Sequence, residues 1–220
     1  MAGHRGTRPP SGLVVPVDIC ERGLDGERVA VADIEHRTWG EWPSLRLTTA
    51  VASVEVVGEV GARIVSLRDV QRDKEWLLQG VPPSELEQME WATEGAVFSG
   101  RESFGWDECF PTTAPCPDPV ASDGTDLRDH GDQWGRGAYL SVDPEEGTVV
   151  HTWSVPRWRY RLSRRLSFED PATLLVRYAA VSHAQEALPV SWAAHPVLAL
   201  EPGSVIELAE VHSVRSSWQH

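Results

Sequence analysis

Three runs of sequence decide the fold: TVVHTWSV (148–155), YRLSRRLSF (160–168) and TLLVRYAAV (173–181). All three are rich in β-branched, aromatic and alternating apolar residues, which is typical of strands that bury one face. Pro-Glu-Glu-Gly at 144–147 and Glu-Asp-Pro at 169–171 supply turn-forming residues before and between them. The pattern therefore predicts consecutive antiparallel strands.

The same strand pattern extends in both directions along the chain. Residues 61–69 alternate apolar and polar side chains after a glycine, and Glu75–Leu78 is expected to pair with them as the return arm of a hairpin. Ser84–Trp91 is the best helix candidate, and Cys116–Asp129 has the composition of a long surface loop. The other predicted strands are Val29–Ile34, Leu45–Ala50, Val54–Val57, Ala138–Val142, Pro189–Leu200 and Val205–Leu208.

Regular strand spacing favours an all-β fold, a large antiparallel β-sandwich. The chain has 220 residues, of which 41% are hydrophobic, so a sizeable core is expected. The first residues are polar and rich in Pro and Gly. We therefore expect a loose N-terminal arm over 1–25 and a single sandwich domain over 26–220.

Composition excludes several function classes. A net charge of -13 argues against a nucleic-acid partner, and no apolar run reaches the ~20 residues of a membrane helix. Cys20, Cys109 and Cys116 lack metal-type or disulfide-framework spacing, which indicates a reducing, cytoplasmic location and no metal. Phosphate-loop, dinucleotide and nucleophile-elbow motifs are missing from the sequence, so no cofactor is expected.

Two histidines are candidate catalytic residues. His195 lies in the strand-like segment SWAAHP (191–196), where it would share a face with Ala193 among small neighbours that leave room for a ligand. His130 lies in a polar loop before Gly131, where an imidazole suits a sugar hydroxyl. The alternatives are a core histidine bonded to a backbone carbonyl and an exposed loop histidine.

Several further side chains are candidate sugar-binding residues. The chain has ten tryptophans against four phenylalanines and three tyrosines, and two of the tryptophans lie among charged residues, where they could stack on a sugar ring. Asp107 and Glu108 are adjacent, so on a strand they face opposite ways and cannot form a glycosidase pair. The candidates, each with a structural or surface role as the alternative, are Arg101, Trp106, Glu108, Trp134 and Arg136.

Taken in order, these segments resemble the aldose 1-epimerase (galactose mutarotase-like) family. The resemblance covers roughly residues 45–208 and rests on GARIVSL (61–67) with EWLL (75–78), GWDECFPT (105–112), DHGDQW (129–134), RRLSF (164–168) and SWAAHPVLAL (191–200). It implies the family's antiparallel β-supersandwich and an aldose, free or phosphorylated, as the partner molecule.

The resemblance also implies roles for the two histidines. His195, in the His-Pro pair, would be the general acid that protonates the ring oxygen. His130, in the His-Gly pair, would hold sugar hydroxyls and stabilise developing charge. Arg101 would correspond to a substrate-binding arginine of the family.

One departure from the family concerns the glutamate base, which lies well downstream of the His-Pro pair. Here 25 residues follow His195, with Glu207 and Glu210 as the carboxylates beyond Glu201. The sequence thus predicts a sandwich that is incomplete at its C-terminus, with exposed sheet edges through which chains could associate. The alternatives to an enzyme are a catalytically silent sugar-binding domain and a truncated remnant that lacks the base.

Overall fold

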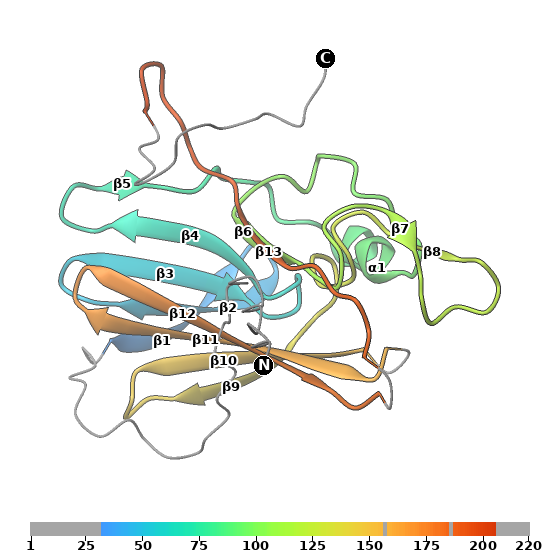
Figure 1. Ribbon diagram of the computed structural model, residues 1–220. Helices are drawn as coiled ribbons and strands as arrows, with labels where there is room; N and C mark the ends of the chain where they lie inside the picture. Colours follow the sequence, from blue (N-terminus) through green and yellow to red (C-terminus); the bar gives the residue numbers. More distant parts are fainter. Residues whose placement is uncertain (1–31, 156–157, 185–186, 206–220) are drawn as a thin grey trace, which may run out of the picture.

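A computed structural model describes residues 32–155, 158–184 and 187–205. The predicted N-terminal arm, Glu207 and Glu210 lie outside these residues, as does all of the predicted strand 205–208 except Val205. The described part is mostly β, with antiparallel sheets and one short helix (Figure 1). The prediction of an all-β antiparallel sandwich is confirmed.

The larger sheet has the strand order β1-β2-β3-β4-β6-β13, with β5 paired to β4. Its strands run antiparallel, and a single residue pair, Ile64 with Trp106, joins β4 to β6. The bounds are β1 Asp33–Trp39, β2 Trp42–Thr48, β3 Ala52–Val57, β4 Arg63–Asp69, β5 Lys74–Glu75, β6 Trp106–Cys109 and β13 Ala193–Pro196.

The smaller sheet, in the order β12-β11-β10-β9, is formed by the strands that the opening sequence runs predict. Leu166 on β11 pairs with both Val149 on β10 and Val176 on β12, so the three strands lie side by side in a continuous antiparallel meander. The bounds are β9 Tyr139–Asp143, β10 Thr148–Val155, β11 Tyr160–Asp170 and β12 Thr173–Ser182.

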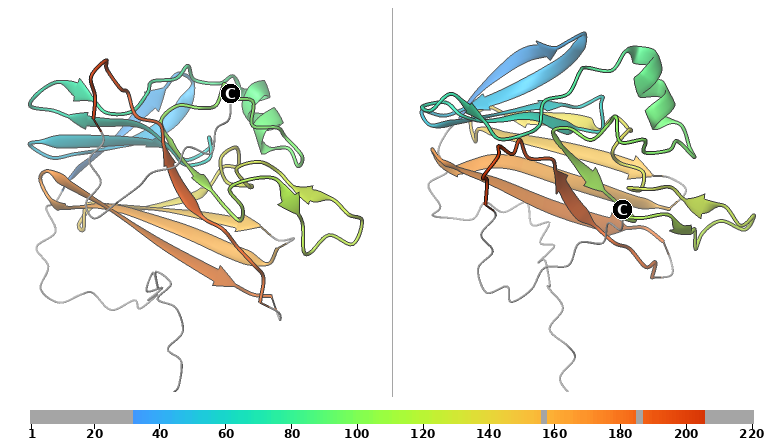
Figure 2. Two further views of the ribbon diagram at one scale, coloured as in Figure 1. Left: turned by 45° about the horizontal axis from the view of Figure 1, so that its top comes forward. Right: turned by 90° about the horizontal axis from the view of Figure 1, so that it is seen from above.

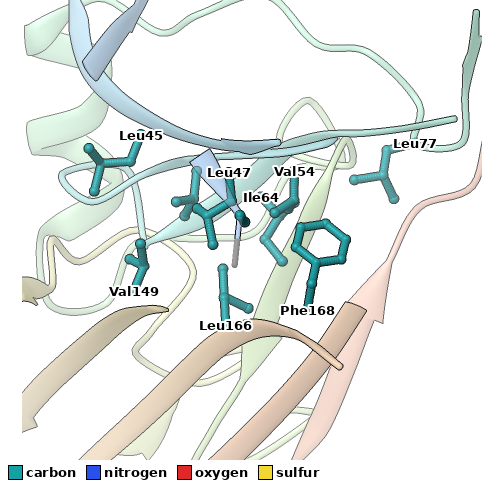
Figure 3. Packing of buried hydrophobic residues seen from close by; sticks show 10 residues of the cluster. Leu45, Leu47, Val54, Ile64, Leu77, Val149, Leu166 and Phe168 are labelled. Atoms are coloured by element: carbon teal, nitrogen blue, oxygen red, sulfur yellow. The ribbon is translucent and has the colours of Figure 1, made fainter. Parts of the chain in front are cut away.

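The two sheets pack face to face around one apolar cluster, which Figure 3 shows from close by. Alternate residues of each strand point inward, and the period of two places Leu45 and Leu47 against Val149 and Leu166. Burial of such side chains stabilises the fold by about 1.5–3 kcal/mol each. The buried members are Ala32, Leu45, Leu47, Val54, Val56, Ile64, Leu77, Val149, Leu166 and Phe168.

The helix and a small hairpin lie at one end of the sandwich (Figures 1 and 2). Helix α1, Glu85–Ala92, begins at a capping box in which Ser84 and Glu87 bond each other's backbone N–H groups, which confirms the predicted helix. Strands β7 (Cys116–Pro117) and β8 (Asp126–Leu127) pair within the predicted loop. In the part of the chain that the structure describes, no helix has the length and apolarity needed to cross a membrane.

Two strands limit the larger sheet in the described residues, β1 and β13. Apolar side chains are exposed in the segments on either side of β13: Val190, Trp192, Leu198 and Leu200. Association of chains through this edge stays a prediction.

Candidate functional site

The strand pair β6–β13 has two faces with different surroundings. His195 pairs with Asp107, and Ala194 pairs with Glu108. Because side chains alternate along a strand, Asp107 and His195 share the face that points away from the smaller sheet, whereas Glu108 points toward that sheet. The expected separation of the two adjacent carboxylates is confirmed.

On the outer face, His195 is held by a buried ion pair. Asp107 Oδ1 accepts a hydrogen bond from His195 Nδ1 at 2.8 Å, while Asp107 Oδ2 lies 2.9 Å from the Arg63 guanidinium. Arg63 also donates to the carbonyls of Glu102 and Phe104, both at 2.7 Å. Arg63 thus fixes Asp107, Asp107 fixes the imidazole, and Nε2 is the His195 nitrogen left for chemistry.

The loop that carries His130 brings a second imidazole beside the first. The His130 and His195 ring centroids are 5.0 Å apart. His130 and Gly131 both have left-handed backbone, with φ of 62° and 70°, and a Cβ at position 131 would lie 2.2 Å from the Phe110 carbonyl oxygen. Only glycine fits there, so Gly131 is what allows His130 to approach β6.

An aromatic side chain that the sequence analysis missed, Phe98, packs on both imidazoles. Its ring stacks on His130 at a centroid distance of 3.8 Å and meets His195 edge-on at 6.1 Å. Phe98 also meets the buried ring of Trp134 in a T-shaped contact at 5.3 Å. The histidine pair therefore has an apolar wall on one side, while the His195 side chain keeps 34% of its surface exposed.

Charge at the outer face favours a protonated His195. The Asp107 hydrogen bond raises the pKa of His195, against the opposing effect of its partial burial. Burial acts to raise the pKa of Asp107, but Arg63 and His195 together hold it below the usual value. Nearby Cys109 is a neutral thiol at pH 7, because burial and the carboxylates around it raise its pKa to about 12.

The inner face of β6 holds a separate polar network. Glu108 accepts hydrogen bonds from Arg164 at 2.9 Å, Tyr178 at 2.7 Å and Trp192 at 3.1 Å. Arg164 and Glu108 are fully buried, and Arg164 also donates to the Ala62 carbonyl. Burial raises the pKa of Glu108 despite these three donors. This network ties the two sheets together.

The structure places only some of the predicted site residues around the histidine pair. Trp134 lies fully buried beneath Phe98, so its ring does not face solvent as a sugar platform would. Glu108 points to the inner face, away from His195, because the strand alternates. The roles of these two side chains in sugar binding stay predictions.

Three other candidates also lie apart from the pair. Arg101 is exposed at a cavity of about 510 Å³ between α1 and the loop after it. Trp106 packs partly buried against the main core, and Arg136 lies beside Asp132 and Tyr160. Their roles in substrate binding stay predictions.

Arg63 and Phe98 escaped the sequence analysis, and Cys109 was considered there as a metal ligand but set aside because its spacing matches no standard site. Arg63 fits the alternation of an ordinary strand, and its burial depends on carbonyls some 40 positions away. Phe98 lies in a loop with no regular pattern. The available signal was the register: once His195 is paired with Asp107, the residue two positions on, Cys109, must share their face.

Comparisons with known proteins find little that resembles this chain. No known family profile matches it, and no curated protein matches its sequence. Among solved structures, it is similar to a "putative mutarotase (YeaD)" from Salmonella typhimurium, with 14% identity and a TM-score of 0.39 over 64% of this chain and 46% of that one. It is also similar to a 4-alpha-glucanotransferase from Thermococcus litoralis, with 10% identity and a TM-score of 0.39 over 67% and 24%.

This chain therefore spans less than half of the first protein and about a quarter of the second. What those proteins act on is not carried over to the residues described here. The roles of these residues rest on their contacts in this molecule.

Proposed function

We propose that the protein is an isomerase of the aldose 1-epimerase type, which interconverts the α and β anomers of an aldose by opening and closing the sugar ring. The observation that carries the proposal is the pair of imidazoles 5.0 Å apart, one of them hydrogen-bonded to a buried carboxylate. Ring opening needs one proton given and one taken, and an imidazole can perform either step.

His195 takes the role of general acid. Its Nδ1 is engaged by Asp107, so the proton on Nε2 is the one it can donate to the ring oxygen. The raised pKa keeps a larger share of the imidazole protonated near neutral pH. Arg63 keeps Asp107 ionised and oriented throughout, and it need not contact the sugar.

His130 takes the role of general base, in place of a glutamate. A neutral imidazole accepts a proton at one nitrogen. His130 Nδ1 lies 3.2 Å from the Asp129 carboxylate, which would stabilise the imidazolium that forms. Within the described residues, the carboxylate that contacts His195 directly is Asp107, and Arg63 already engages it.

The reaction balances with these two groups alone. His130 removes the proton from the anomeric hydroxyl as His195 protonates the ring oxygen, so the bond from C1 to the ring oxygen breaks and an aldehyde forms. Rotation about the C1–C2 bond presents the other face of the carbonyl. The ring hydroxyl then attacks C1, His195 takes its proton back, and His130 returns a proton to the carbonyl oxygen.

A free aldose fits the described residues better than a phosphorylated one. A phosphate needs arginine N–H donors, and Arg128, in the loop that carries His130, is already committed to backbone carbonyls: it donates to Gly131, Trp91, Thr93 and Asp132 at 2.8–3.0 Å. Binding a phosphate there would break several of these bonds. We therefore expect neutral sugars to be the better substrates.

Anomer exchange measured by NMR saturation transfer tests the proposal. The panel contains glucose, galactose, a deoxy sugar and glucose 6-phosphate, with the protein kept in a chelator. We expect exchange above the buffer rate, which falls by about 10²–10⁴-fold in His195→Ala and in His130→Asn. His36→Ala, at an exposed histidine on β1, is the matched control and should leave exchange unchanged.

Two outcomes would contradict the enzyme. Folded protein that exchanges no sugar on the panel but binds one saturably is a carbohydrate-binding domain, the alternative function. Exchange that survives both histidine substitutions would place the chemistry elsewhere in the chain.

A further inference from the structure

We propose that Cys109, His130 and His195 bind one divalent cation of the zinc class. One ligand atom from each side chain, the Cys109 sulfur and a ring nitrogen from each histidine, lies within 4.8 Å of the others. The three come from β6, from the loop before Gly131 and from β13. Along the chain, 21 positions separate Cys109 from His130, and 65 separate His130 from His195. That spacing explains why the sequence led us to expect no metal.

The distances fit a site that closes around an ion. Ligands on one tetrahedral zinc, with bonds of about 2.3 Å to sulfur and 2.0–2.1 Å to nitrogen, lie roughly 3.3–3.6 Å apart. Reaching this from 4.8 Å takes a movement of about an ångström, shared among the three side chains. Three protein ligands leave a fourth position open for water.

The donor set selects the class of cation. A sulfur ligand and imidazole nitrogens suit Zn²⁺, and Co²⁺ as its spectroscopic substitute. Mg²⁺ and Ca²⁺ prefer oxygen ligands, which this trio does not offer. Binding forms one metal–sulfur and two metal–nitrogen bonds, releases metal-bound water, and sends the Cys109 thiol proton to solvent.

Partners behind the ligands give the second, independent line of support. Asp107 holds His195 by Nδ1 and leaves Nε2 free, the carboxylate–histidine arrangement that orients many metal ligands. The Asp129 carboxylate lies 3.2 Å from the His130 ring. Phe98 stacks on His130 and supplies the apolar wall that a dry metal site needs.

The cation would compete with the proposed acid role of His195, because both use Nε2. Zinc binding would therefore inhibit anomer exchange, and a chelator would restore it. The cation site itself does not depend on the proposed function, since its ligands and their partners are described without reference to any sugar.

Cobalt titration tests the inference directly. The full chain, reduced with a phosphine and freed of metal by a chelator that is then removed, is titrated with Co²⁺ alone. We expect one Co²⁺ per chain, visible d–d bands of a four-coordinate ion and a near-ultraviolet band from the thiolate, all displaced by Zn²⁺. Asp107→Asn should weaken binding about 10–100-fold.

Matched cysteine variants assign the band. Cys109→Ser should abolish the thiolate band, whereas Cys116→Ser and Cys20→Ser should keep it. Cys116 is the second free cysteine of the described residues, and Cys20 lies outside them. If Cys109→Ser fails to fold, as judged by circular dichroism, His195→Asn and His130→Asn serve instead, and each should shift the d–d bands.

Several results would overturn the inference: the absence of a thiolate band in the native chain, a band that survives Cys109→Ser, or d–d bands unaffected in both histidine variants. These outcomes are separate from the sugar assay. If the chain binds Co²⁺ but exchanges no sugar, the cation site stands and the proposed enzyme is wrong. If it exchanges sugar but binds no Co²⁺ through Cys109, the enzyme stands and the cation site is wrong.

Discussion

Asp107 and Glu108 are neighbours on strand β6, both carboxylates are fully buried, and each is paired with a buried arginine. Asp107 passes its interaction on to His195, which reaches solvent. Glu108 is surrounded by Arg164, Tyr178 and Trp192 on the face toward the smaller sheet. Two carboxylates one position apart on the same strand therefore have different tasks: Asp107 orients His195, whereas Glu108 joins the two sheets.

The comparison shows that burial of a carboxylate does not by itself mark a functional site. What distinguishes Asp107 is the chemistry of its second partner: His195 is an imidazole, which can gain or lose a proton near neutral pH, whereas Glu108 is bound by a guanidinium, a phenol and an indole. The Arg63–Asp107–His195 network can respond to a ligand or to pH through the imidazole, while the Glu108–Arg164 network contributes to the stability of the fold. Variants at the two positions should separate these effects.

The largest expected effect is on the inner face. Glu108→Gln leaves the Arg164 charge buried without its counter-charge, so we expect a loss of about 3–5 kcal/mol in the free energy of unfolding. Urea denaturation followed by fluorescence measures it. The double variant Glu108→Leu with Arg164→Met removes both charges and should recover most of that loss; a double variant no more stable than the single would contradict the pairing.

On the outer face, Asp107→Asn should cost stability and function together. It leaves Arg63 buried without its counter-charge, but the Glu102 and Phe104 carbonyls still accept hydrogen bonds from that guanidinium, so we expect a loss at the lower end of the same range, about 3 kcal/mol. The pKa of His195, followed by NMR of its ring protons, should fall, because the hydrogen bond to the Asp107 carboxylate that raises it is gone. An unchanged His195 pKa would break the proposed link between the two side chains.

The outer pair should also give a characteristic pH dependence of stability. The pKa of Asp107 is lowered by folding, so its contribution is present above the unfolded value of about 3.9 and is lost as pH falls through the folded value. The pKa of His195 is raised, so its contribution is full below about 6.5 and is lost as pH rises through the folded value.

The stability difference between wild type and Asp107→Asn should therefore be greatest between about pH 4 and 6.5. Urea midpoints across this range measure it. A difference that is flat from pH 4 to 8 would show that the pair does not couple to folding.

The smallest effect is expected from Trp192→Phe. It removes one of the three donors to Glu108 at a side chain that is itself exposed, so we expect a loss of about 1 kcal/mol and unchanged anomer exchange. Urea denaturation measures the loss of stability, and the NMR exchange assay measures the rate of anomer exchange. A large fall in exchange would mean that the inner network also supports the reaction.

Much of the fold could be predicted from sequence because its signals are local. Strands β10, β11 and β12 follow apolar periodicity and turn residues, and α1 follows its capping box. Of the predicted strand Val29–Ile34, residues 29–31 lie outside the described residues, and β1 continues beyond the prediction to Trp39, because its side chains are mostly exposed and polar and carry little apolar periodicity. Strand β6 lacks a local signal, since its burial depends on β13, more than 80 residues later.

The candidate site was predictable only in part, for the same reason. His195 and His130 drew attention through their immediate neighbours, a strand with a proline and a glycine loop. Arg63, Phe98 and Cys109 gain their meaning from contacts with distant segments, which no local pattern encodes. Trp134 drew attention through its charged neighbours in the sequence, yet its ring is fully buried.

The left-handed backbone at His130 has a consequence for how this chain could change. A randomised library at position 130 should return few folded members beyond Asn, Asp and Gly, the residues that best tolerate that conformation. Position 195 lies on an extended strand, where the backbone conformation does not restrict the residue type in this way. The two histidines should therefore differ in how readily they can be replaced. Backbone conformation limits the residues that can stand at position 130, whereas at position 195 only the need for an imidazole does so.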